Sequence, residues 1–80
     1  MSLPARKNNE YPAILRLTIS KDRLTAEMSD GREVSIPIAW FHALAEATQK
    51  QRNHFEISPA GYGIHWPDLD EDISVKAFLT

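Results

Sequence analysis

The chain has 80 residues and carries nine Lys and Arg against eleven Asp and Glu, which gives a net charge of −2 at pH 7. Apolar residues make up 42% and charged residues 25%, a balance typical of folded proteins rather than disordered ones. A chain of this length builds one domain with a small core, so a deep private active-site cleft is hard to form. The negative charge argues against a general nucleic-acid binder, which would show a basic face.

The absence of cysteine excludes disulfides and thiolate chemistry and favours a reducing compartment. No apolar run approaches the roughly 18 residues that a membrane span needs, and no signal-peptide pattern opens the chain. We therefore expect a cytoplasmic protein with no membrane contact.

The first twelve residues are polar and hold Pro4 and Pro12, so residues 1–12 predict a flexible N-terminal arm. We expect a single small α+β domain over residues 13–80. No internal repeat divides it.

Three runs of alternating apolar and polar residues follow the arm, and a period of two is typical of half-buried strands. They cover residues 14–19, 24–28 and 33–36. In the first run, Leu15, Leu17 and Ile19 share one face. Between the second and third runs, Asp30-Gly31 favours the positive φ angles of a tight hairpin. The runs predict a three-stranded antiparallel meander.

A helical region is expected after Pro37, because proline ends a strand and suits the first turn of a helix. The alanine-rich residues Ile38–Ala47 predict one helix, with an apolar stripe able to cover a sheet. The segment Thr48-Gln49-Lys50-Gln51 matches a capping box, with Thr48 as N-cap and Gln51 reaching back. It predicts a second short helical turn over Gln49–Asn53.

The last third of the chain predicts a second β-hairpin, formed by residues 54–58 and 64–66 around the turn 59–63. Gly61 and Gly63 are expected to serve backbone with positive φ. The tail 73–80 fits two patterns, since its apolar residues alternate as in a strand and also form a helical face. The acidic residues before it favour a helix start, so we predict a short C-terminal helix.

The acidic string Asp68, Asp70 and Asp72 resembles the start of a calcium loop, but Ile73 and Leu79 stand where such a loop needs Gly and Glu. A simpler interpretation is that Asp70 or Asp72 caps the last helix. The other interpretation is an acidic docking surface for a basic partner, which would raise the association rate more than the affinity.

The three histidines, at positions 42, 54 and 65, show no spacing typical of a metal site, and packing roles are expected for them. His65 points opposite to its strand neighbours and could face a pocket or a partner. We expect Trp66 to be buried on the sheet, although a half-exposed tryptophan beside acidic residues is a natural contact anchor. No motif assigns a catalytic residue, a cofactor site or a metal site.

Residues 63–67 (Gly-Ile-His-Trp-Pro) and 69–75 (Leu-Asp-Glu-Asp-Ile-Ser-Val) together resemble a family of small bacterial domains, domain-of-unknown-function family 2442. The resemblance covers about residues 14–79 and extends to further matching positions: Asp30-Gly31, Leu44, Ala47-Thr48 and Gln51-Arg52. It implies a fold more firmly than an activity. Some members look like small regulatory or antitoxin-type proteins encoded beside another small protein.

We therefore predict a non-enzymatic protein-binding module, antitoxin-like or regulatory, whose partner is another small protein or a second copy. The candidate partner-binding residues lie in one stretch: His65, Trp66, Asp68, Asp70, Glu71 and Asp72. Two alternatives stay open. One is a nucleic-acid-binding regulator that uses basic residues of the N-terminal half: Arg6, Lys7, Lys21, Arg23 and Arg32. The other is a metal-dependent or acid–base enzyme, in which His65 and the aspartates would converge on one cavity.

Overall fold

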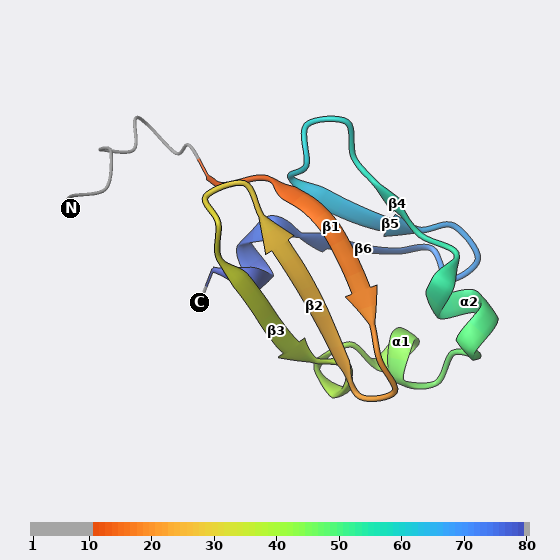
Figure 1. Cartoon of the computed structure of the whole chain (residues 1–80). Coiled ribbons are helices and arrows are strands. Elements are labelled where there is room, and N and C mark those ends of the chain that lie inside the picture. Colours follow the sequence, from red (N-terminus) through yellow and green to blue (C-terminus); the bar gives the residue numbers. More distant parts are fainter. Residues whose placement is uncertain (1–10, 80) are drawn as a thin grey trace.

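The alternating runs form a three-stranded antiparallel meander in the computed structural model, which describes residues 11–79 (Figure 1). Its strands β1 (Ile14–Ile19), β2 (Arg23–Met28) and β3 (Glu33–Pro37) lie in the order β1-β2-β3. Gly31 closes the second hairpin with a φ of 94°, which confirms the turn expected at Asp30-Gly31. Residues 1–10 of the predicted arm lie outside the described residues. Tyr11 and Pro12 do not, and Pro12 is buried.

One detail of β1 corrects the sequence pattern. The β1–β2 register shifts between Ile14 and Arg16, as at a β-bulge, so the alternation restarts there. Ile14 and Leu17 become the buried residues, at 3% and 7% exposed, while Leu15 is 66% exposed. The prediction that Leu15 shares the inward face of Leu17 is therefore wrong, because a bulge reverses the facing of the residues before it.

The expected helix over Ile38–Ala47 is interrupted. A 3-10 helix η1 (Ile38–Trp40) and a short α1 (His42–Ala45) are separated by Phe41, whose backbone is extended at φ −123° and ψ 102°. In one straight helix Ile38 and Leu44 would point about 120° apart around the axis. The break lets both of them enter the core, at 3% and 0% exposed. Burial therefore overrides the helix propensity of this segment.

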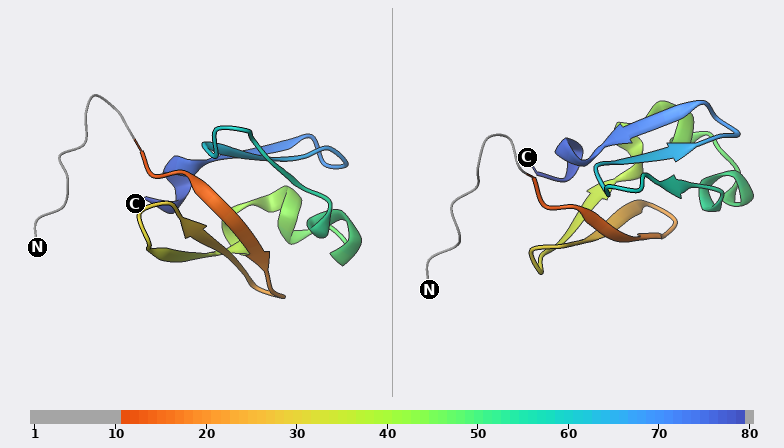
Figure 2. Two further views of the ribbon diagram at one scale, coloured as in Figure 1. Left: turned by 45° about the horizontal axis from the view of Figure 1, so that its top comes forward. Right: turned by 90° about the horizontal axis from the view of Figure 1, so that it is seen from above.

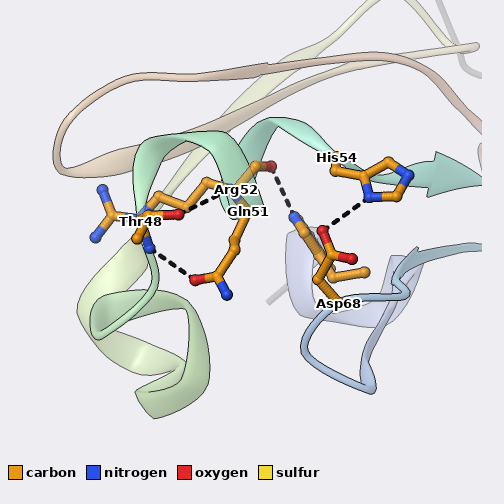
Figure 3. A network of polar contacts seen from close by, with 6 residues as sticks. Thr48, Gln51, Arg52, His54 and Asp68 are labelled. Carbon is orange, nitrogen blue, oxygen red and sulfur yellow. Dashed lines mark hydrogen bonds and ion pairs between the residues drawn. The ribbon is translucent and has the colours of Figure 1, made fainter.

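The second helical turn, α2 (Gln49–Asn53), forms where the capping box predicts it. The Gln51 N–H donates to Thr48 Oγ1 at 3.1 Å, and the Thr48 N–H donates to Gln51 Oε1 at 2.9 Å (Figure 3). These reciprocal bonds satisfy two backbone donors that a helix start otherwise leaves free.

The C-terminal part forms a second antiparallel sheet in the order β4-β5-β6, from β4 (Glu56–Ile57), β5 (Gly63–Trp66) and β6 (Glu71–Ser74). The predicted hairpin corresponds to β4 and β5, and β6 adds a strand that the sequence interpretation missed. The predicted C-terminal helix is a 3-10 helix, η2 (Val75–Phe78), and it starts later than expected. Both periodicities of the tail are real. Ile73 faces inward by strand alternation, and η2 buries its own first and last residues.

The two sheets form two layers, with η2 toward one end and α1 and α2 toward the other (Figure 2). In the described part of the chain, thirteen buried apolar residues form one core cluster between them: Ile14, Leu17, Leu24, Ala26, Met28, Ile36, Ile38, Leu44, Ile64, Trp66, Ile73, Val75 and Phe78. Within residues 11–79, no helix is long and apolar enough to cross a membrane.

Candidate protein-binding surface

The β5–β6 hairpin places the four aspartate and glutamate residues of the C-terminal stretch. Trp66 pairs with Glu71 across the hairpin, and the Leu69 N–H donates to the Trp66 carbonyl at 3.1 Å. Asp70 takes the left-handed conformation, with a φ of 50°, which aspartate tolerates better than most residues and which turns the chain into β6. Asp68 and Asp70 thus lie in the turn, and the other two acids lie on the strand.

The expectation that Asp70 or Asp72 caps the last helix is wrong. Ser74 is the N-cap of η2, and its Oγ accepts from the Lys76 N–H at 3.1 Å. Asp70 is part of the turn and Asp72 is part of β6, so both precede the helix start by more than the reach of a cap. Neither carboxylate is needed to begin η2, and both stay available at the surface.

Two carboxylates of this stretch each meet a histidine. His65 Nδ1 donates to Asp72 Oδ1 at 2.7 Å, across the β5–β6 register in which these residues face each other. His54 Nδ1 donates to Asp68 Oδ2 at 2.8 Å, between the end of α2 and the turn (Figure 3). The pairs are separate. Among the side chains of residues 11–79, no three His, Asp and Glu come close enough together to hold a metal ion.

The outer face of the second sheet carries an open hollow of about 520 Å³. Glu56, His65 and Asp72 form one row across its three strands and line it. Gly63, which has no side chain, lies beside this row on β5. Gly61 has the positive φ expected for it, at 77°, but Gly63 does not, so that part of the glycine prediction is wrong.

The serines that line this hollow are already engaged with the backbone. The hydroxyl oxygen of Ser58 accepts from the N–H groups of Tyr62 and Gly63, at 3.1 and 3.2 Å. Ser74 Oγ holds the start of η2. The polar side chains of this hollow are therefore one histidine, two carboxylates, and two serines whose hydroxyls bind backbone N–H groups.

Trp66 lies on the opposite face of β5 and is fully buried, at 0% exposed. Its indole Nε1–H donates to the Arg52 carbonyl at 2.8 Å, and its ring lies 6.1 Å from that of Phe55. The burial expected for this ring is confirmed. A buried ring offers no contact area, so the prediction that Trp66 binds a partner is wrong.

Arg52 joins three parts of the fold, although in the sequence it stands out only as a match to the family pattern. Its guanidinium donates to the carbonyls of Leu44, Ala45 and Lys21, at 2.9, 3.1 and 3.1 Å. The side chain thus ties α2 to the end of α1 and to the β1–β2 turn. No sequence signal distinguishes it from a surface arginine, because its partners are main-chain carbonyls distant along the chain.

The basic residues of the N-terminal half do not form a continuous basic stripe in the described part of the chain. Arg32 meets Asp30 at 2.9 Å. Arg23 donates to the Ser35 hydroxyl and carbonyl, at 2.8 and 3.0 Å. Lys21 lies in the turn between β1 and β2. Arg6 and Lys7 lie outside the described residues.

Charge is divided unevenly between the two sheets. Residues 56–74, which form the second sheet, contain five Asp and Glu and no Lys or Arg. The rest of the chain carries all nine Lys and Arg against six Asp and Glu. We call the five carboxylates of the second sheet the acidic surface: Glu56, Asp68, Asp70, Glu71 and Asp72.

Comparison with known proteins finds one family model, described as "Protein of unknown function (DUF2442)", that matches residues 14–80. A crystal structure of a protein of unknown function from Rhodospirillum rubrum is similar, with a TM-score of 0.74 and 26% identity over 88% of this chain and 87% of that chain. A solution structure of an uncharacterized protein from Chromobacterium violaceum is also similar, with a TM-score of 0.68 and 25% identity over 84% of this chain. This chain spans 63% of that second protein. A search of the curated proteins gives no match.

Proposed function

The chain belongs to the DUF2442 family of proteins of unknown function, and we propose that it acts in the cytoplasm as a non-enzymatic protein-binding module with an antitoxin-like or regulatory role. Its partner is another small protein that presents a basic segment to the acidic surface. The observation that carries the proposal is the segregation of charge. One sheet holds five carboxylates with no Lys or Arg, in a chain that otherwise has an excess of cations.

The chemistry of the acidic surface favours a cationic partner over the other candidates. Its carboxylates lie along the β5–β6 hairpin and on β4, with Glu56 and Asp72 on the outer side of the sheet and Glu71 on the Trp66 side. This concentration of negative charge attracts a cationic partner. A second copy of the chain would bring like charges together, so self-association through this surface is disfavoured. Complementary charge would also make association fast and sensitive to salt.

Affinity capture with a charge-reversed variant tests this proposal. The side chains of Glu56 and Glu71 form no hydrogen bond or ion pair within residues 11–79, so we expect their replacement to leave the fold intact. The double variant Glu56→Lys and Glu71→Lys should lose a partner that the wild-type chain retains from the native cell. A matched control, Asp22→Lys and Glu33→Lys, makes the same charge change on the first sheet and should retain that partner.

Several results would contradict the proposal. Equal capture by both double variants would remove the acidic surface from the interaction. A wild-type chain that elutes as a lone monomer and retains no partner at any concentration would remove the binding role. Tight, salt-sensitive binding of DNA or RNA in a low-salt gel shift would favour the nucleic-acid alternative, because counterion release makes such binding fall steeply with salt.

A further inference from the structure

Strand β6 lies at the border of the second sheet. Among residues 11–79 it pairs with β5 alone, and Figure 2 shows it as the outermost strand of that layer. An edge strand presents unpaired backbone N–H and C=O groups, which form a template for another strand. The first question is which groups of β6 point outward.

The hydrogen bonds of β5 show in which direction the backbone N–H and C=O groups of Ser74 point. The Val75 N–H donates to the Tyr62 carbonyl at 2.9 Å, which makes these two residues a hydrogen-bonded pair. Bonded and non-bonded pairs alternate along an antiparallel ladder, so the next pair, Gly63 and Ser74, is non-bonded. The Gly63 carbonyl indeed turns the other way and accepts from the Ser58 N–H at 2.9 Å. The backbone groups of Ser74 therefore point away from β5.

The same alternation makes the His65–Asp72 pair non-bonded through its backbone, so Asp72 also turns its N–H and C=O to the open edge. Asp72 and Ser74 are both exposed. Within the described part of the chain, no hydrogen bond reaches the backbone of Asp72 from outside β6. The Ser74 carbonyl, in contrast, belongs to the N-cap of η2 and accepts the first hydrogen bond of that helix. Three main-chain groups on this edge are thus oriented for pairing: the N–H and C=O of Asp72 and the N–H of Ser74.

The charge of this edge selects among possible strands. Glu71 and Asp72 lie on β6, and Asp68 and Asp70 lie in the turn before it. Like charges directly opposite across a ladder are destabilising, and opposite charges are stabilising. The acidic residues therefore oppose pairing with the β6 of a second copy and favour a basic strand.

We propose that β6 takes up an extended basic segment of the partner protein as a fourth strand of the second sheet. This inference rests on the proposed function and specifies the binding mode: main-chain bonds to Asp72 and Ser74 supply the pairing, and charge supplies the selection. Side chains of a strand alternate between the two faces. A lysine or arginine on the outer face then lies beside Asp72, and the residue on the inner face lies beside Ile73.

A synthetic peptide tests the mode directly. The probe is a blocked, fluorescently labelled peptide of alternating lysine and valine, and its Kd is measured by fluorescence anisotropy. Two further peptides carry N-methyl groups either on the lysine amides or on the valine amides, with unchanged charge. Only one set of amides faces β6 in an added strand, so one methylated peptide should bind about tenfold more weakly than the other.

A matched pair of protein variants tests the same edge. Ser74 has a φ of −76°, which proline adopts without strain. Ser74→Pro and Ser74→Ala both remove the hydroxyl that caps η2, but only the proline removes the outward N–H. Ser74→Pro should bind the unmodified peptide about tenfold more weakly than Ser74→Ala. Circular dichroism checks that both variants are folded, and the methylated peptides need no variant at all.

The outcomes separate this inference from the function on which it rests. Salt-sensitive binding by the wild-type chain, with equal affinity for both methylated peptides, would overturn strand addition and leave the acidic surface as a docking site. Absence of binding to the unmodified peptide would overturn both. A wild-type chain that dimerises in sedimentation, with Ser74→Pro monomeric, would assign the edge to a second copy and overturn the basic strand.

Discussion

The outer faces of the two sheets use their charged residues differently. On the first sheet, Arg16 meets Glu27 across the β1–β2 pair at 3.7 Å, and Arg23 is held by Ser35 across the β2–β3 pair. On the second sheet, the carboxylates that have partners meet only histidines, as Asp72 meets His65. Within residues 11–79, the first sheet and its hairpin thus contain ion pairs between arginines and carboxylates, Arg16–Glu27 and Arg32–Asp30, whereas the carboxylates of the second sheet meet no Lys or Arg. This difference supports the proposal that the second sheet is the binding surface and the first sheet is scaffold.

The largest expected effect tests whether the inner face of the second sheet is purely structural. Trp66→Ala should lower the free energy of unfolding by about 3–5 kcal/mol, because it empties a large, fully buried site. A domain of this size has little more stability to lose, so the variant should be largely unfolded. Trp40→Ala is the control, since this ring is 58% exposed, and it should change stability by about 0.5 kcal/mol or less. Urea denaturation followed by circular dichroism measures both.

The next effect compares the stability contributed by two arginines. Arg52 lies at the junction of α2, α1 and the β1–β2 turn, and Arg23 lies on the first sheet. Arg52→Met keeps the aliphatic stem but removes donors to three carbonyls, and it should cost about 1.5–3 kcal/mol. Arg23→Met removes contacts at an exposed strand surface and should cost about 1 kcal/mol or less. Equal losses in urea denaturation would mean that the junction is no more important than a surface contact.

A smaller effect compares how much two residues of β6, Ser74 and Asp72, contribute to stability. Ser74→Ala removes the cap of η2 and should cost about 0.5–2 kcal/mol. Asp72→Ala should cost about 0.5 kcal/mol or less, because its side chain is 75% exposed and its histidine partner keeps access to water. Thermal unfolding of the two variants gives the order, and a larger loss for Asp72→Ala would show that this carboxylate serves the fold.

The smallest effect concerns the repulsion within the acidic surface. The double variant Glu56→Lys and Glu71→Lys should gain up to about 0.5 kcal/mol of stability at low salt, because it relieves like-charge crowding. The gain should shrink as salt is added. The control, Asp22→Lys and Glu33→Lys, should show no salt-dependent gain. If it gains as much, the two sheets do not differ in their charge balance.

Local patterns predicted most of the fold. The period of two predicts the three-stranded meander, and Asp30-Gly31 predicts the turn of its second hairpin. The capping box predicts α2 and the two hydrogen bonds at its start. The errors occur where a non-local contact decides the backbone. Leu15 turns outward at the bulge of β1, where the Ile14 N–H donates to the carbonyl of Gly61, distant in sequence. At Phe41 the predicted helix is interrupted, and the break lets both Ile38 and Leu44 enter the core. Neither event has a signature in its own segment.

The sequence predicts which residues make up the candidate surface, but it does not predict how they are arranged. The acidic stretch and His65 are visible in the sequence, and the two separate histidine–aspartate pairs are not, because His54 approaches Asp68 only through tertiary structure. The edge of β6 could not be predicted either. The sequence pattern predicts an acidic approach up to residue 72 and a helix from residue 73, and only the β5–β6 register shows which backbone groups of residues 71–74 face outward.

The central claim is that the second sheet, and not the first, is the binding surface. The most direct test is a titration of the ¹⁵N-labelled full chain with the lysine–valine peptide, followed residue by residue in amide spectra. The account predicts shifts confined to residues 56–76 and largest at Asp72 and Ser74, with the amides of β1, β2 and β3 unmoved. Shifts concentrated on the first sheet, or spread evenly over both sheets, would contradict it.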